Sequence, residues 1–202
     1  MIKLYRQILF PVLACFLLLT SCQYAYAGEP TDQLKQSIDA VLAVLTNKEL
    51  RQPGREAERR AEIRKIIYDR FDFREMARSA LALNWRQRTP EEKKEFVSLF
   101  ADLVEDSYIR KVERYRGEKV LYGDEFVHDH NALVRTKVIT KTNTEIPIDY
   151  MLLKKGAKWW VYDVKIEGVS LVNNYRTQFE DIIASSSYKD LVSRLKKKVS
   201  RE

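Results

Sequence analysis

The chain has few cysteines, glycines and histidines, and each shortage argues against a class of protein. Both cysteines, Cys15 and Cys22, lie in the first 27 residues, so a chain cleaved after Ala27 folds without disulfides and has no thiol nucleophile. The six glycines form neither a Gly-x-Gly-x-x-Gly nor a Gly-x-x-x-x-Gly-Lys loop, which argues against nucleotide binding. Gly168-Val169-Ser170 lacks the second glycine of a nucleophile elbow, which argues against a serine hydrolase.

Residues 1–27 are typical of a signal peptide. Lys3 and Arg6 form a basic start, an apolar segment follows, and Ala25-Tyr26-Ala27 provides a cleavage site of small residues. The apolar segment is shorter than the roughly 20 residues that a membrane-spanning helix needs. We therefore predict that the signal peptide is removed and that residues 28–202 are exported as one domain.

A second processing site overlaps the first. Leu19-Thr20-Ser21-Cys22 fits a lipoprotein cleavage box, which would leave Cys22 acylated and the domain anchored to a membrane. The sequence alone leaves both sites open.

The charge of the exported part is mildly basic. It keeps 34 of the 36 basic residues and all 29 acidic ones, because only Lys3 and Arg6 are charged within the signal peptide, and its net charge is therefore +5. Export argues against nucleic acid as the partner. Anionic lipid head groups or an acidic protein surface fit the charge better, and a lysine-rich helix face exposed to solvent explains it equally well.

The pattern of apolar residues predicts an α+β fold. Up to Gly117 the period is helical, and Asp72 is expected to cap a helix that runs up to Trp85. Thr89-Pro90-Glu91-Glu92 is a capping box that predicts the start of a long helix. From Lys119 the period is two. The expected strands cover residues 120–127, 133–140, 145–153 and 159–166, and two helices follow at 171–183 and 188–199.

This succession predicts a four-stranded antiparallel meander packed against several helices. On the third strand Ile146, Ile148, Tyr150 and Leu152 share one face, and on the fourth Trp160, Tyr162, Val164 and Ile166 do so. We expect helices to cover this apolar side.

Few residues offer chemistry. His128-Asp129-His130 has too few ligands to hold a metal by itself and precedes Asn131, so we interpret it as a turn. Asp149 and Asp163 lie within expected strands. Buried there, they would have raised pKa values and would suit a small acid/base enzyme with a cone-shaped pocket, which is the alternative hypothesis.

Several blocks of residues then stand in order along the chain: Phe71-Asp72-Phe73 with Met76-Ala77 and Trp85; Thr89-Pro90-Glu91 with Phe96 and Phe100; and Trp160-Val161-Tyr162-Asp163-Val164 with Glu167-Gly168-Val169-Ser170-Leu171, Asn174-Tyr175-Arg176 and Gln178-Phe179. Together they resemble the MlaC family over nearly the whole exported part. MlaC is the periplasmic component of the Mla pathway, which maintains lipid asymmetry, and is also called the toluene-tolerance auxiliary protein.

The resemblance implies a function without catalysis. It implies a monomeric periplasmic shuttle that carries phospholipid between an outer-membrane lipoprotein complex and an inner-membrane ABC transporter with MCE subunits. It implies no cofactor, metal or nucleic acid, and phospholipid is the cargo. An acylated Cys22 would depart from this picture, since a tethered protein cannot diffuse, and would instead favour a membrane-anchored adaptor.

Lipid cargo demands apolar burial. Two acyl chains carry on the order of 30 methylenes, and at about 0.8 kcal/mol each a bare lipid in water costs more than ~20 kcal/mol. We therefore expect an elongated internal cavity between the sheet and the long helix. Its expected lining is Phe73, Met76, Phe96, Phe100, Val104, Tyr108, Ile148, Tyr150, Leu152, Trp160, Tyr162, Val164, Val169 and Tyr175.

Overall fold

The structure is a computed structural model, and it describes residues 28–199. Within this range six α-helices and one 3₁₀ helix accompany a five-stranded sheet. The helices are α1 (Glu29–Thr46), α2 (Glu56–Arg70), α3 (Phe73–Leu81), η1 (Ala82–Gln87), α4 (Pro90–Glu113), α5 (Leu171–Ser185) and α6 (Tyr188–Val199). The strands are β1 (Lys119–His128), β2 (Asn131–Ile139), β3 (Glu145–Lys155), β4 (Lys158–Ile166) and β5 (Val169–Ser170).

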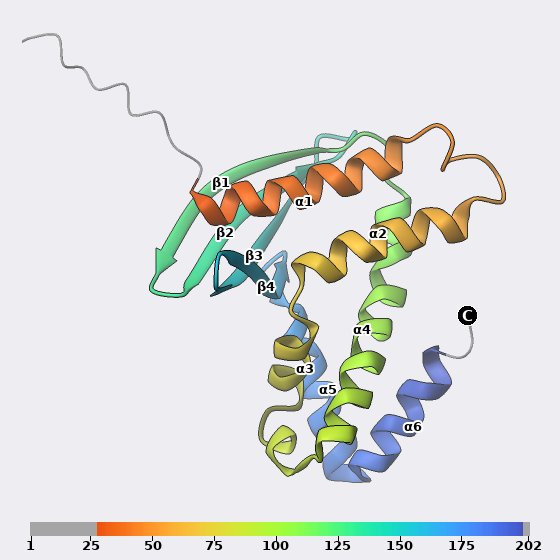
Figure 1. Ribbon diagram of the computed structural model, residues 1–202, viewed down its shortest axis with the longest axis vertical. Coiled ribbons are helices and arrows are strands. Elements are labelled where there is room, and N and C mark those ends of the chain that lie inside the picture. The colour runs from red at the N-terminus through yellow and green to blue at the C-terminus, as the bar shows by residue number, and fades with distance from the viewer. Residues whose placement is uncertain (1–27, 200–202) are drawn as a thin grey trace, which may run out of the picture.

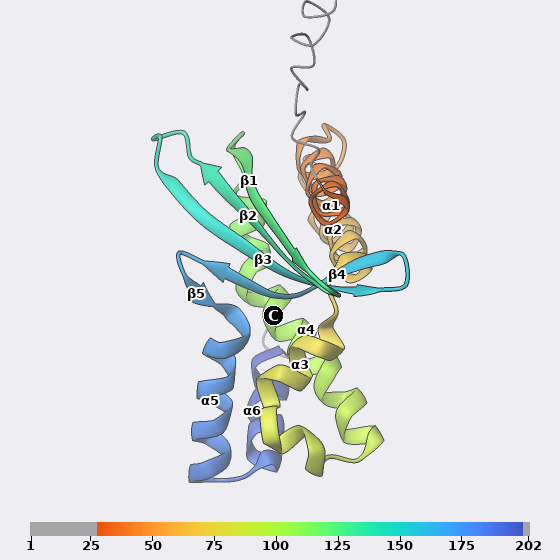
Figure 2. The ribbon, with the colours of Figure 1, turned by 90° about the vertical axis from the view of Figure 1, so that its left-hand side faces the viewer.

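The elements form an upper and a lower part along the long axis of the molecule (Figure 1). In the upper part the antiparallel sheet, in the order β1-β2-β3-β4-β5, has α1 and α2 on one side, as Figure 2 shows. In the lower part α3, α5, α6 and the first half of α4 form a helical bundle. The predicted α+β class is confirmed.

The predicted strand count is wrong by one. We expected the fourth strand to be followed by a helix with no further strand between them, but Glu167 and Gly168 both have positive φ, 51° and 82°. Such a two-residue turn reverses the chain without splaying the strands. Val169 and Ser170 therefore pair with Ile166 and Lys165 as β5 before α5 begins.

A β-bulge corrects the predicted facing of β4. Leu152 pairs with Val161, but Met151 pairs with Asp163, so Tyr162 is one residue too many for the ladder. Because an extra residue reverses the alternation of side chains, Trp159 and Val161 share a face with Val164 and Ile166. Trp160 and Tyr162, which we expected on that face, do not belong to the apolar cluster there.

The expected helix caps are present. Thr89 accepts a hydrogen bond from the backbone N–H of Glu92 and Glu92 returns one to Thr89, so the predicted capping box begins α4. Asp72 likewise caps α3 by accepting from the backbone N–H of Glu75 at 3.0 Å. Each such cap stabilises its helix by about 1 kcal/mol.

The predicted cavity between the sheet and the long helix is not found within residues 28–199. Aromatic residues that we expected to line it pack instead on one another inside the helical bundle. Phe100 makes edge contacts with Tyr175 and Phe179, with ring centroids 5.5 and 6.1 Å apart. The first half of α4 therefore buries its stripe against α3, α5 and α6 and leaves none of it for the sheet.

One buried arginine joins the upper elements. Arg70, the last residue of α2, is 7% exposed and donates hydrogen bonds to Gln33 Oε1 at 2.9 Å, Ser37 Oγ at 2.8 Å and the Trp159 carbonyl at 2.7 Å. Burial lowers the pKa of Arg70 from its ordinary value. The chain continues through Asp72, whose N–H donates to the Val161 carbonyl at 2.8 Å. The elbow between α2 and α3 is thus fixed to both α1 and β4.

We predict that Arg70→Met destabilises the protein by about 2–3 kcal/mol. The substitution keeps the length of the side chain but leaves one buried and two half-buried acceptors with fewer donors, and an unmet buried acceptor costs about 1–3 kcal/mol. Urea unfolding followed by circular dichroism measures the change, with the exposed Arg74→Met as the matched control. Equal stability of the two variants would contradict this role of Arg70.

Candidate functional site

The apolar stripe of α1 is buried at its two ends and half-exposed in its middle. Leu34 is 1% exposed in the cluster on the sheet, and Leu45 is 8% exposed in a second cluster with α2 and α4. Between them Ile38 and Val41 are half-exposed. Since one continuous stripe normally belongs to one core, the middle of α1 lies over a region where packing is incomplete.

The sheet presents matching residues to this region. In adjacent strands Ile148 pairs with Ile166, and Tyr150 pairs with Val164. Ile148, Tyr150 and Ile166 pack on the sheet cluster but remain half-exposed. On β1 and β2 the face continues with Tyr122, the cross-strand partner of Thr136.

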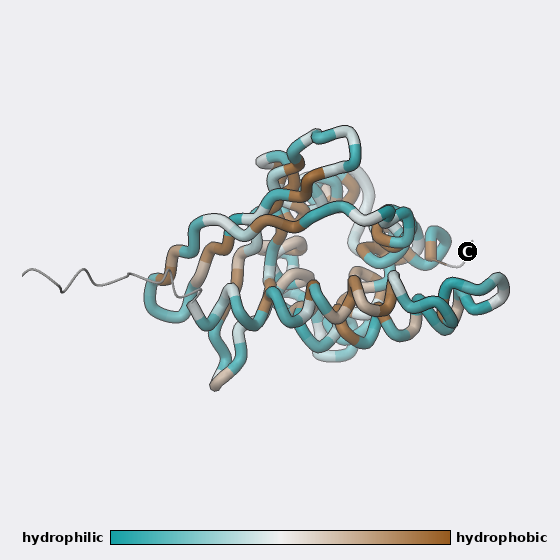
Figure 3. The backbone as a smooth tube through the Cα atoms, turned by 90° about the horizontal axis from the view of Figure 1, so that it is seen from above, coloured by the Kyte–Doolittle hydropathy of each residue, from teal (hydrophilic) through white to brown (hydrophobic). Residues whose placement is uncertain are grey.

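The second half of α4, with Tyr115 just beyond its end, completes the region. Tyr108, Val112 and Tyr115 are half-exposed, and Val112 and Tyr115 pack with residues of α1 and α2. Seen from above in Figure 3, the strands, α1 and α4 lie around a common centre, whereas the connection between α1 and α2 at the right is hydrophilic. We name the half-exposed apolar residues on α1 and the sheet the inner surface: Ile38, Val41, Tyr122, Val138, Ile146, Ile148, Tyr150 and Ile166.

The inner surface contains two tyrosine hydroxyls in apolar surroundings. Burial raises the pKa of Tyr150 to about 12. Burial, then the Asp39 carboxylate and Tyr150, raise the pKa of Tyr122 above its ordinary value. Both therefore stay protonated at neutral pH and act as hydrogen-bond donors.

The predicted lining residues fall into three groups. Those in or against the core of the helical bundle are Phe73, Met76, Phe96, Phe100, Val104, Tyr108 and Tyr175. Those in or against the sheet cluster are Ile148, Tyr150, Leu152 and Val164. Trp160, Tyr162 and Val169 belong to neither, and Val169 is 62% exposed on the surface. The structure brings only the sheet group, with Tyr108 nearby on α4, to the half-exposed region.

Other residues of the inner surface were absent from the predicted lining. Ile146 and Ile166 share the predicted apolar face of their strands, and Ile38 and Val41 lie on the helical stripe of α1, so periodicity already marked them as inward-facing. Nothing in the sequence marked them as half-exposed, because that follows from how far the helices lie from the sheet.

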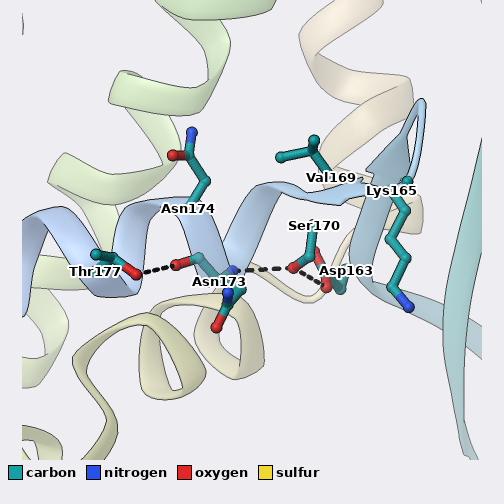
Figure 4. A pocket seen from close by; sticks show the side chains of 8 residues that line it. Asp163, Lys165, Val169, Ser170, Asn173, Asn174 and Thr177 are labelled. Carbon is teal, nitrogen blue, oxygen red and sulfur yellow. Dashed lines mark hydrogen bonds between the residues drawn. The ribbon is translucent and has the colours of Figure 1, made fainter.

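The carboxylate of Asp163 organises a turn. It accepts hydrogen bonds from Ser170 Oγ at 2.5 Å and from the backbone N–H groups of Val164 at 2.8 Å and Val172 at 3.0 Å. Ser170 in turn accepts from the N–H of Asn173 at 3.0 Å and caps α5. Asp163 therefore holds the start of α5 against β4, as Figure 4 shows.

A shallow open hollow of about 630 Å³ lies beside this turn and includes Lys165, Val169 and Thr177 (Figure 4). Asp163 is the only carboxylate among the described residues that line the hollow. Its oxygens already accept hydrogen bonds from Ser170 and from two backbone N–H groups, so the hollow has no carboxylate free to act as an acid or base. Asp149 lies opposite Arg135 and Lys165 in neighbouring strands, and opposite charges at such positions are favourable.

The remaining candidate groups are structural. Asp129 has φ of 52° and, with His130, forms the turn between β1 and β2, as we predicted for His128-Asp129-His130.

Within residues 28–199 no group of three or more metal-ligating side chains is present. None of the helices in this range combines the length and apolar character needed to cross a membrane.

We predict that Asp163→Ala destabilises the protein by about 1–3 kcal/mol, because Ser170 and two backbone N–H groups lose their acceptor. Thermal unfolding measures this loss. Asp149→Ala is the matched control on the neighbouring strand and should cost less than about 1 kcal/mol. A larger loss for Asp149→Ala than for Asp163→Ala would refute the structural role of Asp163.

Comparison with known proteins agrees with the arrangement of the elements. A solved structure of a phospholipid-binding protein from Ralstonia solanacearum, in complex with a phospholipid, superposes with a TM-score of 0.78 and 26% sequence identity. The match covers 86% of this chain and 98% of that one. None of the curated proteins compared with the chain matches it.

A family model gives the assignment. Residues 35–197 match the model of the MlaC protein, a range that begins within α1 and ends within α6. The match therefore includes the sheet and most of α1, which carry the inner surface, and the second half of α4. The chain belongs to the MlaC family.

Proposed function

We propose that this protein is a periplasmic phospholipid-binding shuttle. It carries lipid between an outer-membrane lipoprotein complex and an inner-membrane ABC transporter with MCE subunits. The observation that carries the proposal is the incomplete packing of the inner surface, where apolar side chains of α1 and four strands face inward yet remain half-exposed. Membership of the MlaC family and the phospholipid bound to the Ralstonia solanacearum protein support the same conclusion.

The energetics of the inner surface suit a carrier. Burial of apolar area is worth roughly 25 cal/mol per Å², so inward apolar side chains left half-exposed are unfavourable unless something covers them. An acyl chain covers them and is itself removed from water. The protein therefore binds cargo at a surface that its own fold leaves unsatisfied.

The lipid-contact residues that we propose begin with the predicted residues on the sheet, Ile148 and Tyr150, and extend to Ile38, Val41 and Ile166. Apart from the half-exposed Tyr108, the predicted residues of the helical bundle core are buried against one another. They reach the cargo only if α4 moves relative to α3 and α5.

Catalysis is not part of the proposal. The two carboxylates that an enzyme would use lie away from the inner surface: Asp149 stands in register between Arg135 and Lys165, and Asp163 holds the start of α5. Lipid is bound and released unchanged, without a cofactor, and transfer follows the relative affinities of the partners.

The first test is native mass spectrometry of the processed protein isolated from the periplasm, followed by denaturing extraction. We expect one phospholipid-sized adduct on a monomer whose mass corresponds to cleavage after Ala27. Protein of unmodified mass without any adduct, after gentle isolation, would refute the shuttle. An acylated Cys22 would replace it by a membrane-anchored protein.

The second test locates the cargo on the sheet. Ile148→Glu places a charge on the inner surface, and we expect the lipid-loaded fraction to fall at least about tenfold, because a carboxylate cannot be buried beside acyl chains without a partner. Leu133→Glu is the matched control, since Leu133 is also half-exposed and lies on the opposite face of the neighbouring strand. Equal loss of lipid in both variants, at equal stability, would contradict the inner surface as the binding site.

A further inference from the structure

The inner surface contains a polar pair that the apolar cargo chains do not explain. The hydroxyl of Tyr122 is buried and has no hydrogen-bond partner within residues 28–199. No hydrogen bond is found for the hydroxyl of Tyr150 in the same range either, and Tyr150 lies half-exposed against the sheet cluster. A buried hydroxyl without a partner costs about 1–3 kcal/mol, so a native fold retains it only where something else satisfies it.

The position of Tyr122 is built by the strand. Tyr122 pairs with Thr136 and Glu125 pairs with Val134, so one extra residue lies between them on β1 and both side chains face α1. Glu125 accepts hydrogen bonds from the N–H of Thr31 at 2.8 Å and from its hydroxyl at 2.5 Å. These hydrogen bonds hold β1 close to α1. Tyr122 is the next residue of β1, after Glu125, whose side chain lies on the face that α1 covers.

Two neighbouring polar groups of this face, Glu125 and Thr136, are already paired. The carboxylate of Glu125 is used by Thr31, and the hydroxyl of Thr136 donates to the Ile148 carbonyl at 2.9 Å. Among described residues of this face, the buried Tyr122 hydroxyl and, at the far end of the face, the buried indole N–H of Trp159 therefore lack an acceptor, and the half-exposed Tyr150 hydroxyl has no hydrogen bond within the protein. The raised pKa values of both tyrosines keep them protonated, so an acceptor must supply the missing bond.

From the exposed side of α1 towards the inner surface, the side chains change from charged to hydrogen-bonding to apolar. At the rim Lys35 and Asp39 of α1 form an ion pair at 2.5 Å with side chains 50% and 54% exposed, and the Lys35 ammonium lies 5.8 Å from the centre of the Tyr122 ring. Tyr122 on β1, Ile148 on β3 and Ile166 on β4 then follow in one row across the strands, and Tyr150 lies two residues from Ile148 along β3 on the same face. Charged, hydrogen-bonding and apolar groups thus succeed one another as head group, ester and acyl chain do in a diacyl lipid.

We propose that Tyr122 and Tyr150 form a subsite for the ester carbonyls of a diacyl glycerolipid. The inference rests on the proposed function and adds the part of the lipid that the protein recognises. Ester carbonyls accept hydrogen bonds but donate none, so they require donors when they leave water. Head-group phosphate is a poorer match, because an anion gains more from solvent and from Lys35 at the rim than from neutral hydroxyls in apolar surroundings. The subsite thus selects ester-linked lipids and is tolerant of the head group.

The experiment compares two lipids that differ only at the linkage. Purified full-length processed protein is stripped of lipid and offered an equimolar mixture of a diester phosphatidylglycerol and its dialkyl ether analogue with chains of equal length. Native mass spectrometry then gives the ratio of the two complexes. Two hydrogen bonds of ordinary strength correspond to about a tenfold preference for the diester.

The variants Tyr122→Phe and Tyr150→Phe remove one donor each. We expect each to lower the preference about threefold and the double variant to abolish it, while total lipid binding persists through the acyl chains. Tyr188→Phe is the matched control, because its hydroxyl donates to the Glu92 carbonyl at 3.3 Å within the helical bundle. The preference of the control should equal that of the wild type.

Unfolding of the lipid-free protein gives a second, independent readout. Tyr122→Phe removes an unpaired hydroxyl, so we expect the lipid-free variant to be as stable as the wild type or more stable. A clearly less stable lipid-free variant would show that the hydroxyl serves the fold, through a buried water for example, and would overturn the subsite.

The possible failures are distinguishable. An unchanged preference in the double variant, or no preference in the wild type, overturns the subsite and leaves the lipid-binding function intact. Failure of the wild type to bind either lipid overturns the proposed function itself.

Discussion

The hydrogen bonds of Arg70 are the constraint on which the upper half of the molecule depends. A guanidinium that is 7% exposed can persist only if its donors are satisfied, and here the acceptors come from α1 and β4. Gln33 accepts from Arg70 and also from the backbone N–H of Trp159 at 2.9 Å, so three elements meet at one polar network. The network fixes where α1 crosses the sheet, and this crossing determines which part of its apolar stripe is covered.

The half-exposed inner surface follows from that geometry. Three apolar clusters form where elements are held close: beneath the first part of α1, between α1, α2 and the end of α4, and inside the helical bundle. Ile67 packs against two of these clusters and Phe71 against another pair, but the clusters do not merge. A single well-packed core would be more stable and would leave no surface for a ligand. Separation of the clusters is therefore the structural condition for carrying apolar cargo.

The sequence predicts the local elements well and the long-range arrangement only in part. The capping box at Thr89, the cap at Asp72 and the period of two after Lys119 are local signals, and the structure confirms each. The facing of Trp160 could not be predicted, because a bulge reverses alternation without leaving a mark in the pattern of apolar residues. Nor could the lining be predicted, since Phe100 on α4 and Ile148 on β3 are equally apolar. Which of them is packed depends on contacts between elements far apart in the chain.

The division between a packed lower half and an incompletely packed upper half also bears on how a carrier remains folded when it is empty. Aromatic contacts such as that between Phe96 and Phe179, with ring centroids 5.7 Å apart, give the helical bundle a core that requires no ligand. The sheet is held by its own ladder of backbone hydrogen bonds and by the tie between Glu125 and Thr31. Neither source of stability uses the inner surface, so loss of cargo exposes that surface without removing the contacts that define the fold. A protein that alternates between loaded and empty states needs this independence, because a core completed only by lipid would unfold at each release.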